Sequence, residues 1–226
     1  MNITVIVRTL NEEKNVNRFC ASYQWADQIL MADGGSEDET ISVASQWENV
    51  QVRAFTEMNE FDGGIKANPR GRHVNFLIDW AKDKDADIII FDDVDCVPTK
   101  SLQANGRAFL EPLLDRDAMM FAYRMFIYGQ DKWFPQMTPR QSLWAWSSEI
   151  DVKADEESYT LSMKIPDAYR MKVEYPYALL HYFYPDEKTL AKKKRQYVAT
   201  GEVLPDYAPL QQFGKLEDLP AWAVWK

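Results

Sequence analysis

The chain has 226 residues, 46% hydrophobic and 27% charged, a composition typical of a folded globular domain and not of a disordered chain. Its formal net charge of −9 argues against binding to a nucleic-acid backbone. Cys20 and Cys96 are too few for a disulfide framework, no apolar stretch approaches the roughly 18 residues of a transmembrane span, and the start lacks a signal-peptide pattern. We therefore expect a cytoplasmic protein, with a peripheral contact to a membrane left open.

The first half of the chain alternates apolar strands with amphipathic helices. Apolar runs predict strands at residues 3–7, 28–32, 50–55 and 87–91. Apolar residues at helical spacing predict helices after Asn11, which would be an N-cap, after Ser36 or Asp38, and around 74–81. This order implies an α/β fold in which a Rossmann-like, mostly parallel sheet carries helices on both faces.

The pattern changes beyond residue 115. Residues 118–128 predict another strand, residues 129–185 hold short β-like pieces, and a terminal helix is expected from about 186 to 200. No repeat, low-complexity tract or linker separates the two halves. We therefore expect a single domain, residues 1–226, whose halves of about 1–115 and 116–226 have different tasks.

Three carboxylates, Asp92, Asp93 and Asp95, directly follow the buried strand at 87–91. In open α/β sheets this carboxyl edge is where ligands bind. On an extended chain Asp93 and Asp95 would share one face. Anions packed together repel unless a cation lies between them, and a hard divalent ion that itself holds a phosphate is the natural occupant. The alternative is a solvated acidic turn.

Polar loops also follow the first two strands, at residues 8–13 and 33–40. Both loops are expected at the same sheet edge as Asp93. The Asp33 carboxylate could accept hydrogen bonds from a base N–H or a ribose hydroxyl there. The alternative is a turn residue whose side chain satisfies its own loop.

Three segments carry a resemblance to a known family: residues 3–15 (ITVIVRTLNEEKN), 33–40 (DGGSEDET) and 91–95 (FDDVD). Together they resemble the family 2 glycosyltransferases, inverting enzymes of the GT-A fold that use nucleotide sugars. The resemblance covers roughly residues 1–100, with weaker similarity to about residue 200.

The resemblance implies that a nucleotide sugar, expected to be UDP-linked, binds over the sheet edge. Thr9 and Glu12 would lie along its base and ribose, and Asp33 would hold the base or ribose. The residues assigned to the nucleotide sugar are Thr9, Asn11, Glu12, Asp33, Arg72, Asp92 and Asp93.

The resemblance further implies Mn²⁺ or Mg²⁺ as cofactor, with Asp93, Asp95 and His181 as ligands. Asp95 is the stronger carboxylate candidate, and the role of Asp92 is open. Many family members carry a late histidine before a basic helix, which His181 matches. The residues alone instead indicate a half-buried histidine whose hydrogen bonds are satisfied within the protein. Where many members have an acidic residue, this chain has Cys96, which we expect to be a small buried residue without chemistry.

A basic loop with Lys66, Arg70 and Arg72 precedes the helix around 74–81. It resembles a family loop whose guanidinium could pair with the diphosphate of the donor. The alternative is a solvated basic loop. His73 is expected at the surface or at the helix start.

Residues 133–151 are expected on the acceptor side, where a base must take a proton from the acceptor hydroxyl. Glu149 is the first candidate for this base and Asp151 the second, although the histidine expected before the glutamate is Ser148. Trp144 and Trp146 could stack on a sugar or could be plain core residues.

The resulting expectation is a metal-dependent, inverting hexosyltransferase of polysaccharide biosynthesis. It would move a sugar from a UDP-sugar to a hydroxyl of a glycan, lipid or protein acceptor. Two alternatives are a sugar nucleotidyltransferase and a non-catalytic protein that binds sugar nucleotides or glycans. The first usually has a Gly-rich loop after the first strand, and residues 8–12 contain no glycine.

Overall fold

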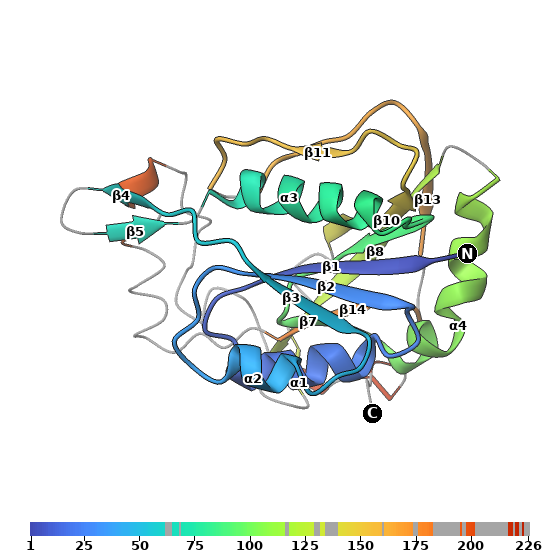
Figure 1. Ribbon diagram of the computed structural model, residues 1–226. Coiled ribbons are helices and arrows are strands. Elements are labelled where there is room, and N and C mark those ends of the chain that lie inside the picture. Colours follow the sequence, from blue (N-terminus) through green and yellow to red (C-terminus); the bar gives the residue numbers. More distant parts are fainter. Residues whose placement is uncertain are drawn as a thin grey trace.

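The computed structural model describes residues 1–61, 65–67, 69–115, 118–128, 132–133, 140–159, 161–173, 176–182, 195, 198–201, 217–218, 220–221 and 223. Within these ranges the chain forms a curled central sheet in the order β15-β9-β8-β10-β6-β1-β2-β3, with helices on both faces (Figure 1). The α/β fold class expected from the sequence is confirmed.

The parallel part of the sheet contains β1 (Ile3–Thr9), β2 (Gln28–Asp33), β3 (Val50–Ala54) and β6 (Ile88–Phe91). These strands pair in parallel in the order β6-β1-β2-β3. Every residue of β6 is buried, as an uninterrupted apolar run predicts. All four strands were expected from the sequence.

Three helices connect these strands and cover the two faces. Helices α1 (Glu13–Ser22) and α2 (Thr40–Ala44) lie on one face, and α3 (Arg70–Asp83) lies on the other (Figure 1). Helix α1 begins at Glu13, after Asn11 in a left-handed conformation with φ of 57°. Asn11 is therefore not the N-cap that the sequence predicted.

The second half of the chain adds antiparallel strands to the same sheet. Strand β10 (Arg140–Ser147) runs antiparallel between β6 and β8 (Ala118–Tyr128). The other edge of β8 pairs in parallel with β13 (Tyr169–Lys172) and β14 (Leu179–Tyr182). The remaining elements are β7 (Cys96–Pro98), α4 (Lys100–Leu110), a 3₁₀ turn (Glu111–Leu113), β9 (Lys132–Trp133), β15 (Glu217–Asp218) and the hairpins β4–β5 (Asn59–Phe61, Ile65–Ala67) and β11–β12 (Lys153–Ala154, Met163–Lys164).

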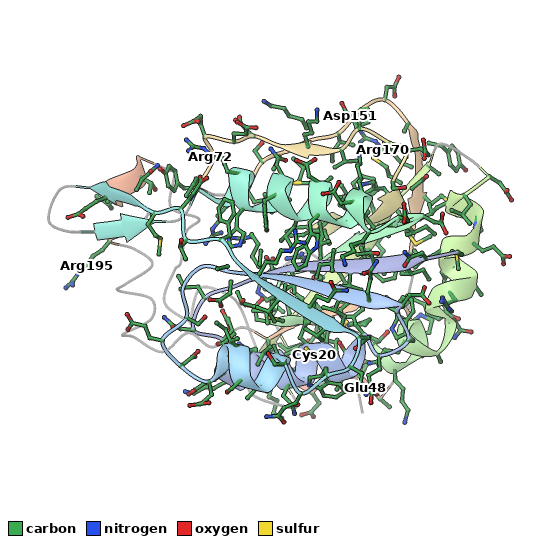
Figure 2. The ribbon with its side chains drawn as sticks, viewed as in Figure 1. Cys20, Glu48, Arg72, Asp151, Arg170 and Arg195 are labelled. Atoms are coloured by element: carbon green, nitrogen blue, oxygen red, sulfur yellow. The ribbon has the colours of Figure 1, made fainter. Side chains whose placement is uncertain are left out.

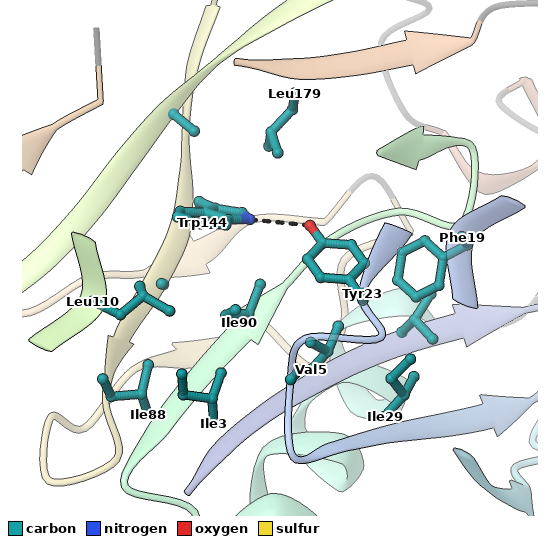
Figure 3. Packing of buried hydrophobic residues seen from close by; sticks show 14 of the residues in the cluster. Ile3, Val5, Phe19, Tyr23, Ile29, Ile88, Ile90, Leu110, Trp144 and Leu179 are labelled. Carbon is teal, nitrogen blue, oxygen red and sulfur yellow. Dashed lines mark hydrogen bonds between the residues drawn. The ribbon is translucent and has the colours of Figure 1, made fainter. Parts of the chain in front are cut away.

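Residues of both halves share the core clusters on the two faces of the sheet, as expected for a single domain. On the face of α1, Tyr23 and Ile90 pack with Trp144, whose indole N–H donates to the Tyr23 hydroxyl at 3.1 Å (Figure 3). On the face of α3, Trp146 packs with Leu77. Both tryptophans are 0% exposed, so they are core residues and do not stack on sugars.

Two features of the second half complete the description. Most of the expected helix at 186–200 lies outside the described residues, within which residues 195 and 198–200 are helical. Among the described helices, none combines the length and the apolar character needed to cross a membrane.

Candidate active site

The strand ends and loops that carry the expected site residues meet at one edge of the sheet. Strands β1, β2 and β6 are parallel, and Thr9 lies in register with Asp33. Because parallel strands end on the same side, residues 8–13, 33–40 and 92–95 share the carboxyl edge. This part of the sequence prediction is confirmed by the strand pairing.

The Asp33 carboxylate holds its own loop and the neighbouring one. It accepts four hydrogen bonds: from the Thr9 hydroxyl at 3.0 Å, the Gly35 amide at 2.9 Å, and the Ser36 amide and hydroxyl at 2.7 and 2.6 Å. A carboxylate has about four acceptor positions, so these contacts fill its capacity. The structure therefore shows the turn-stabilising contacts that the sequence left as the alternative.

Asn11 and Glu12 likewise lock the first loop onto the second. The Asn11 amide donates to the Ser36 hydroxyl at 2.8 Å, and the Glu37 amide donates to the Asn11 side-chain oxygen at 2.9 Å. The Glu12 amide donates to the Thr40 hydroxyl at 2.7 Å, and the Glu12 carboxylate accepts from the Asn15 side chain. Two loops far apart in sequence thus form one rigid rim.

The acidic run after β6 is a turn and not an extended strand. The Cys96 amide donates to the Asp93 carbonyl at 2.8 Å, which closes the turn. The rule that residues two apart share a face therefore does not apply to Asp93 and Asp95. The three carboxylates point into different surroundings.

Asp92 lies inside the protein and is 0% exposed. Its carboxylate accepts from the Tyr23 hydroxyl at 2.7 Å and from the Asp93 amide at 3.0 Å. Burial raises the pKa of Asp92 to about 6, although Arg124 acts in the opposite direction. In this structure Asp92 is an anchor of the turn, and its predicted contact with a nucleotide sugar is untested.

Arg124 of β8 braces the two adjacent carboxylates. It donates to Asp93 Oδ2 at 2.8 Å and to Asp92 Oδ1 at 3.4 Å. Burial would raise the pKa of Asp93, but Arg124 and Arg8 outweigh it and hold that pKa well below its usual range. Sequence reasoning missed Arg124; the available signal was a single cation within the long apolar run at 118–128.

Asp95 and His181 form the candidate metal site. Strand β14 pairs antiparallel with β7 and sets His181 opposite Cys96, which brings His181 Nε2 to 3.2 Å from Asp95 Oδ2. Ligand atoms of Asp95, Cys96 and His181 all lie within 4.8 Å of one another. A carboxylate oxygen and an imidazole nitrogen are ligands that suit Mn²⁺, so these two residues fit the expected ion.

Two other groups fit a metal less well. Burial raises the pKa of the Cys96 thiol well above its usual value, so the thiol stays neutral, as expected for a small buried residue. Asp93, also predicted to be a metal ligand, is instead engaged by Arg124 and lies outside the group of possible ligands.

The basic loop is only partly oriented toward this site. Arg72 pairs with Glu57 at 3.5 Å and with Glu157 at 3.0 Å, near the β4–β5 hairpin (Figure 2). Arg70, in contrast, lies close enough to Arg8 to lower its pKa. Arg70 is therefore better placed than Arg72 to face the carboxyl edge; the side chain of Lys66 lies outside the described ones.

His73 lies at the start of α3, as expected, but it is buried and not at the surface. Its Nε2 is 2.9 Å from the Ala32 carbonyl, which can only accept, so this nitrogen carries the proton. The ring stacks on Phe55 at 4.5 Å. Burial, followed by the charge of Arg8, lowers the pKa of His73 to about 3.

Glu149 and Asp151, the two candidates for the base, lie at the opposite edge of the sheet. Ser147 at the end of β10 pairs with Ile88 at the start of β6, and the Ser148 amide donates to the Asp87 carbonyl. At about 3.3 Å per residue, the start of β6 is roughly 17 Å from Asp93. This placement contradicts the prediction, because neither carboxylate can reach a hydroxyl at the carboxyl edge; Figure 2 shows Asp151 far along the molecule from Arg72.

Comparisons with known proteins agree with this fold. No family model matches the sequence, and no curated protein matches it. Among solved structures, S. aureus TarS residues 1–349 in complex with UDP matches 94% of this chain and 68% of that one, with a TM-score of 0.56 and 14% identity. The same fragment with UDP-GlcNAc has a TM-score of 0.55 and 15% identity, over 83% of this chain and 60% of that one.

A second protein matches at the same level. Glucosyl-3-phosphoglycerate synthase from Mycobacterium tuberculosis, in complex with Mn²⁺, UDP and glucosyl-3-phosphoglycerate, has a TM-score of 0.51 and 15% identity, over 90% of this chain and 81% of that one. The chain spans only 39% of the longer TarS structure. At these identities the likeness concerns the fold, and on that ground the chain has the GT-A fold of glycosyltransferases.

Proposed function

We propose that this chain is a glycosyltransferase that takes its sugar from a nucleoside-diphosphate donor, most simply a UDP-sugar. The observation that carries the proposal is the grouping of Asp93, Asp95, His181, Arg8 and Arg124 at the carboxyl edge of a GT-A sheet. A site with both anions and cations suits a metal–diphosphate complex, which presents charges of both signs. UDP or UDP-GlcNAc bound to the similar structures supports the same donor class.

The interlocked loops would receive the nucleoside. Thr9, Asn11 and Glu12 shape the rim together with Asp33, so the base and ribose would meet a surface that is already rigid. The four hydrogen bonds to Asp33 assign it the role of fixing this rim. Preorganisation of this kind reduces the ordering cost of binding.

Asp95 and His181 would hold the divalent ion, Mn²⁺ or Mg²⁺. When bound, the ion would supply positive charge that stabilises the departing diphosphate. Arg124 keeps Asp93 ionised and fixed beside this site, and Arg70 would add a cation on the side of α3.

The finer features of the reaction belong to the same proposal. We propose family 2-type inversion by one displacement at the anomeric carbon, with a hydroxyl of a glycan, lipid or protein as acceptor, as in polysaccharide biosynthesis. The acceptor would approach from the half of the chain beyond residue 115. The base must lie near the donor, at the carboxyl edge. Because Glu149 and Asp151 are not there, another group at that edge would take this role.

The test is a panel of nucleotide sugars assayed for metal-dependent hydrolysis and transfer. We expect turnover of a UDP-sugar with Mn²⁺ that EDTA abolishes, and a loss of about 100-fold or more in Asp95→Asn. Asp83→Asn is the matched control, since Asp83 is an exposed carboxylate at the far end of α3. Pyrophosphate release from a nucleoside triphosphate and a sugar phosphate, or binding without transfer, would instead support the two alternatives.

A further inference from the structure

Arg8 is a mostly buried cation that, within the described residues, has an unused hydrogen-bond donor. Its side chain is 16% exposed, and its buried Nε has no hydrogen-bond partner. The closest carboxylate oxygen, Asp93 Oδ1, is 3.7 Å from Nη2, which is beyond hydrogen-bond distance. That carboxylate is already bonded to Arg124 at 2.8 Å.

Charges of both signs surround Arg8: Asp93, Asp95 and Glu12 attract it, while burial and a neighbouring cation oppose its charge. Ile6 packs on the α3 face of the sheet, and Arg8, two residues further along β1, lies on the same face. Arg70, the first residue of α3, repels it, and together with burial lowers the pKa of Arg8 to about 10. The N-terminus of this helix adds a partial positive charge.

A buried guanidinium with unused donors is costly unless a ligand supplies the missing acceptors. Arg8 lies at the carboxyl end of β1, the same edge as Asp93 and Asp95, where the ligand would bind. An acceptor that fits must be strongly anionic, since Arg8 and Arg70 both face it, and must offer several oxygens to a planar fork. A diphosphate satisfies both conditions, and a neutral sugar or nucleoside satisfies neither.

We propose that Arg8 is a diphosphate-binding residue of the donor site, whose guanidinium donates directly to donor phosphate oxygens beside the metal site. This inference rests on the proposed function and adds to it a residue from β1, whereas the sequence had assigned the diphosphate to a guanidinium of the basic loop with Arg70 and Arg72. It also explains the position of Arg124, which neutralises Asp93 and so leaves Arg8 available for the ligand.

The test compares the binding of UDP with that of uridine, which lacks the phosphates, by calorimetry in the presence of Mn²⁺. Arg8→Gln removes the charge, Arg8→Lys keeps it without the fork, and Arg107→Gln is the matched control. Arg107 pairs with Asp27 at the opposite edge, where Asp27 accepts from the Ile3 amide. Thermal melts of each variant check that it is folded.

We expect Arg8→Gln to weaken UDP binding about 10- to 100-fold while uridine affinity stays within about twofold, because a charge-assisted bond is lost only with UDP. Arg8→Lys should fall between Arg8→Gln and the wild type, and Arg107→Gln should match the wild type. Equal losses for UDP and uridine, or no loss for either, would overturn the assignment. If Arg8→Gln does not fold, the lysine variant decides, and an unchanged ratio of UDP to uridine affinity contradicts the proposal. Failure of the wild type to bind UDP would instead refute the proposed function.

Discussion

The three carboxylates at the end of β6 are neighbours in sequence but have different environments. Asp92 is buried against Tyr23, Asp93 is paired with Arg124, and Asp95 is beside His181. Here the turn that follows β6 separates them, so that one anchors the chain, one is neutralised by arginine and one lies beside a histidine.

The brace formed by Arg124 should dominate the stability of this turn. Removing one partner of a buried pair leaves an uncompensated charge, so Arg124→Met should lower the free energy of unfolding by about 3 kcal/mol or more at pH 7.5. Part of this loss should be recovered at pH 5, where Asp92 can take up a proton because its pKa is raised to about 6. Urea denaturation at the two pH values measures both effects.

Arg107→Met is the control for this measurement. Arg107 and Asp27 are each about two-fifths exposed, and ion pairs in such positions contribute only about 0–1 kcal/mol. If the free energy of unfolding falls no more in Arg124→Met than in the control, the contacts of Arg124 with Asp92 and Asp93 do not stabilise the acidic turn.

At the scale of elements, helix α3 is held by a strap formed by residues 151–159 and 161–165, which runs along it (Figure 1). The Asn75 side chain makes a reciprocal pair with the backbone of Ala154, at 2.7 and 3.1 Å. The Gly71 amide donates to the Ser158 carbonyl at 3.2 Å. The strap therefore fixes the start of α3, next to Arg70.

Gly71→Ala should be strongly destabilising for a steric reason. A Cβ at this position would lie 1.7 Å from the Asp155 carbonyl oxygen, a backbone atom that can move only with the strap. We expect a loss of about 2 kcal/mol or more in the free energy of unfolding, even though alanine favours helices.

Gly106→Ala in α4 separates this effect from a general intolerance of helical glycines. Its Cβ would meet the far end of the Trp25 ring at 2.6 Å, and Trp25 is only partly buried, so the ring can rotate away. The control should lose clearly less stability than Gly71→Ala in the same urea titration. Equal losses in the two variants would mean that the clash with the strap adds no destabilisation of its own.

The sequence predicted the elements whose pattern is local. The buried runs of β1, β2 and β6 and the apolar spacing in α1 and α3 identified most of the parallel half and its carboxyl edge. Local pattern says nothing about strand direction, however, and β10 enters antiparallel beside β6. That direction carries Glu149 to the wrong edge, and the interior position of β10 between β6 and β8 buries Trp144 and Trp146.

Contacts between distant residues were equally out of reach of the sequence. Arg124 is 31 residues from Asp93 and lies in an apolar strand, so no spacing rule links them. The same holds for the bond from the Thr9 hydroxyl to Asp33, whereas the three bonds from Gly35 and Ser36 are local and match the alternative that the sequence left open. The position of His181 was reached only through the family resemblance, and the pairing of β14 with β7 supplies its physical cause.

At the scale of the whole molecule, two buried groups act in opposite directions on stability between pH 4 and 6.5. His73 has a folded-state pKa of about 3, below its unfolded value of about 6.5, so its contribution to stability is complete above pH 6.5 and is lost as the pH falls. Asp92 has a folded-state pKa of about 6, above its unfolded value of 3.8, so the folded state gains stability as the pH falls through 6. The two contributions partly cancel in the intact protein.

His73→Gln should separate them. Glutamine can still donate to the Ala32 carbonyl but does not titrate, so the contribution of His73 is removed while that of Asp92 stays. Between pH 7.5 and pH 5 the free energy of unfolding of the wild type should fall by about 2 kcal/mol relative to that of the variant. Urea titrations of both proteins at half-unit pH intervals give this difference directly. Any fixed cost of the substitution cancels in the comparison. Parallel stability profiles would therefore mean that the pKa of His73 is the same in the folded and the unfolded protein, which the burial of the ring and the charge of Arg8 argue against.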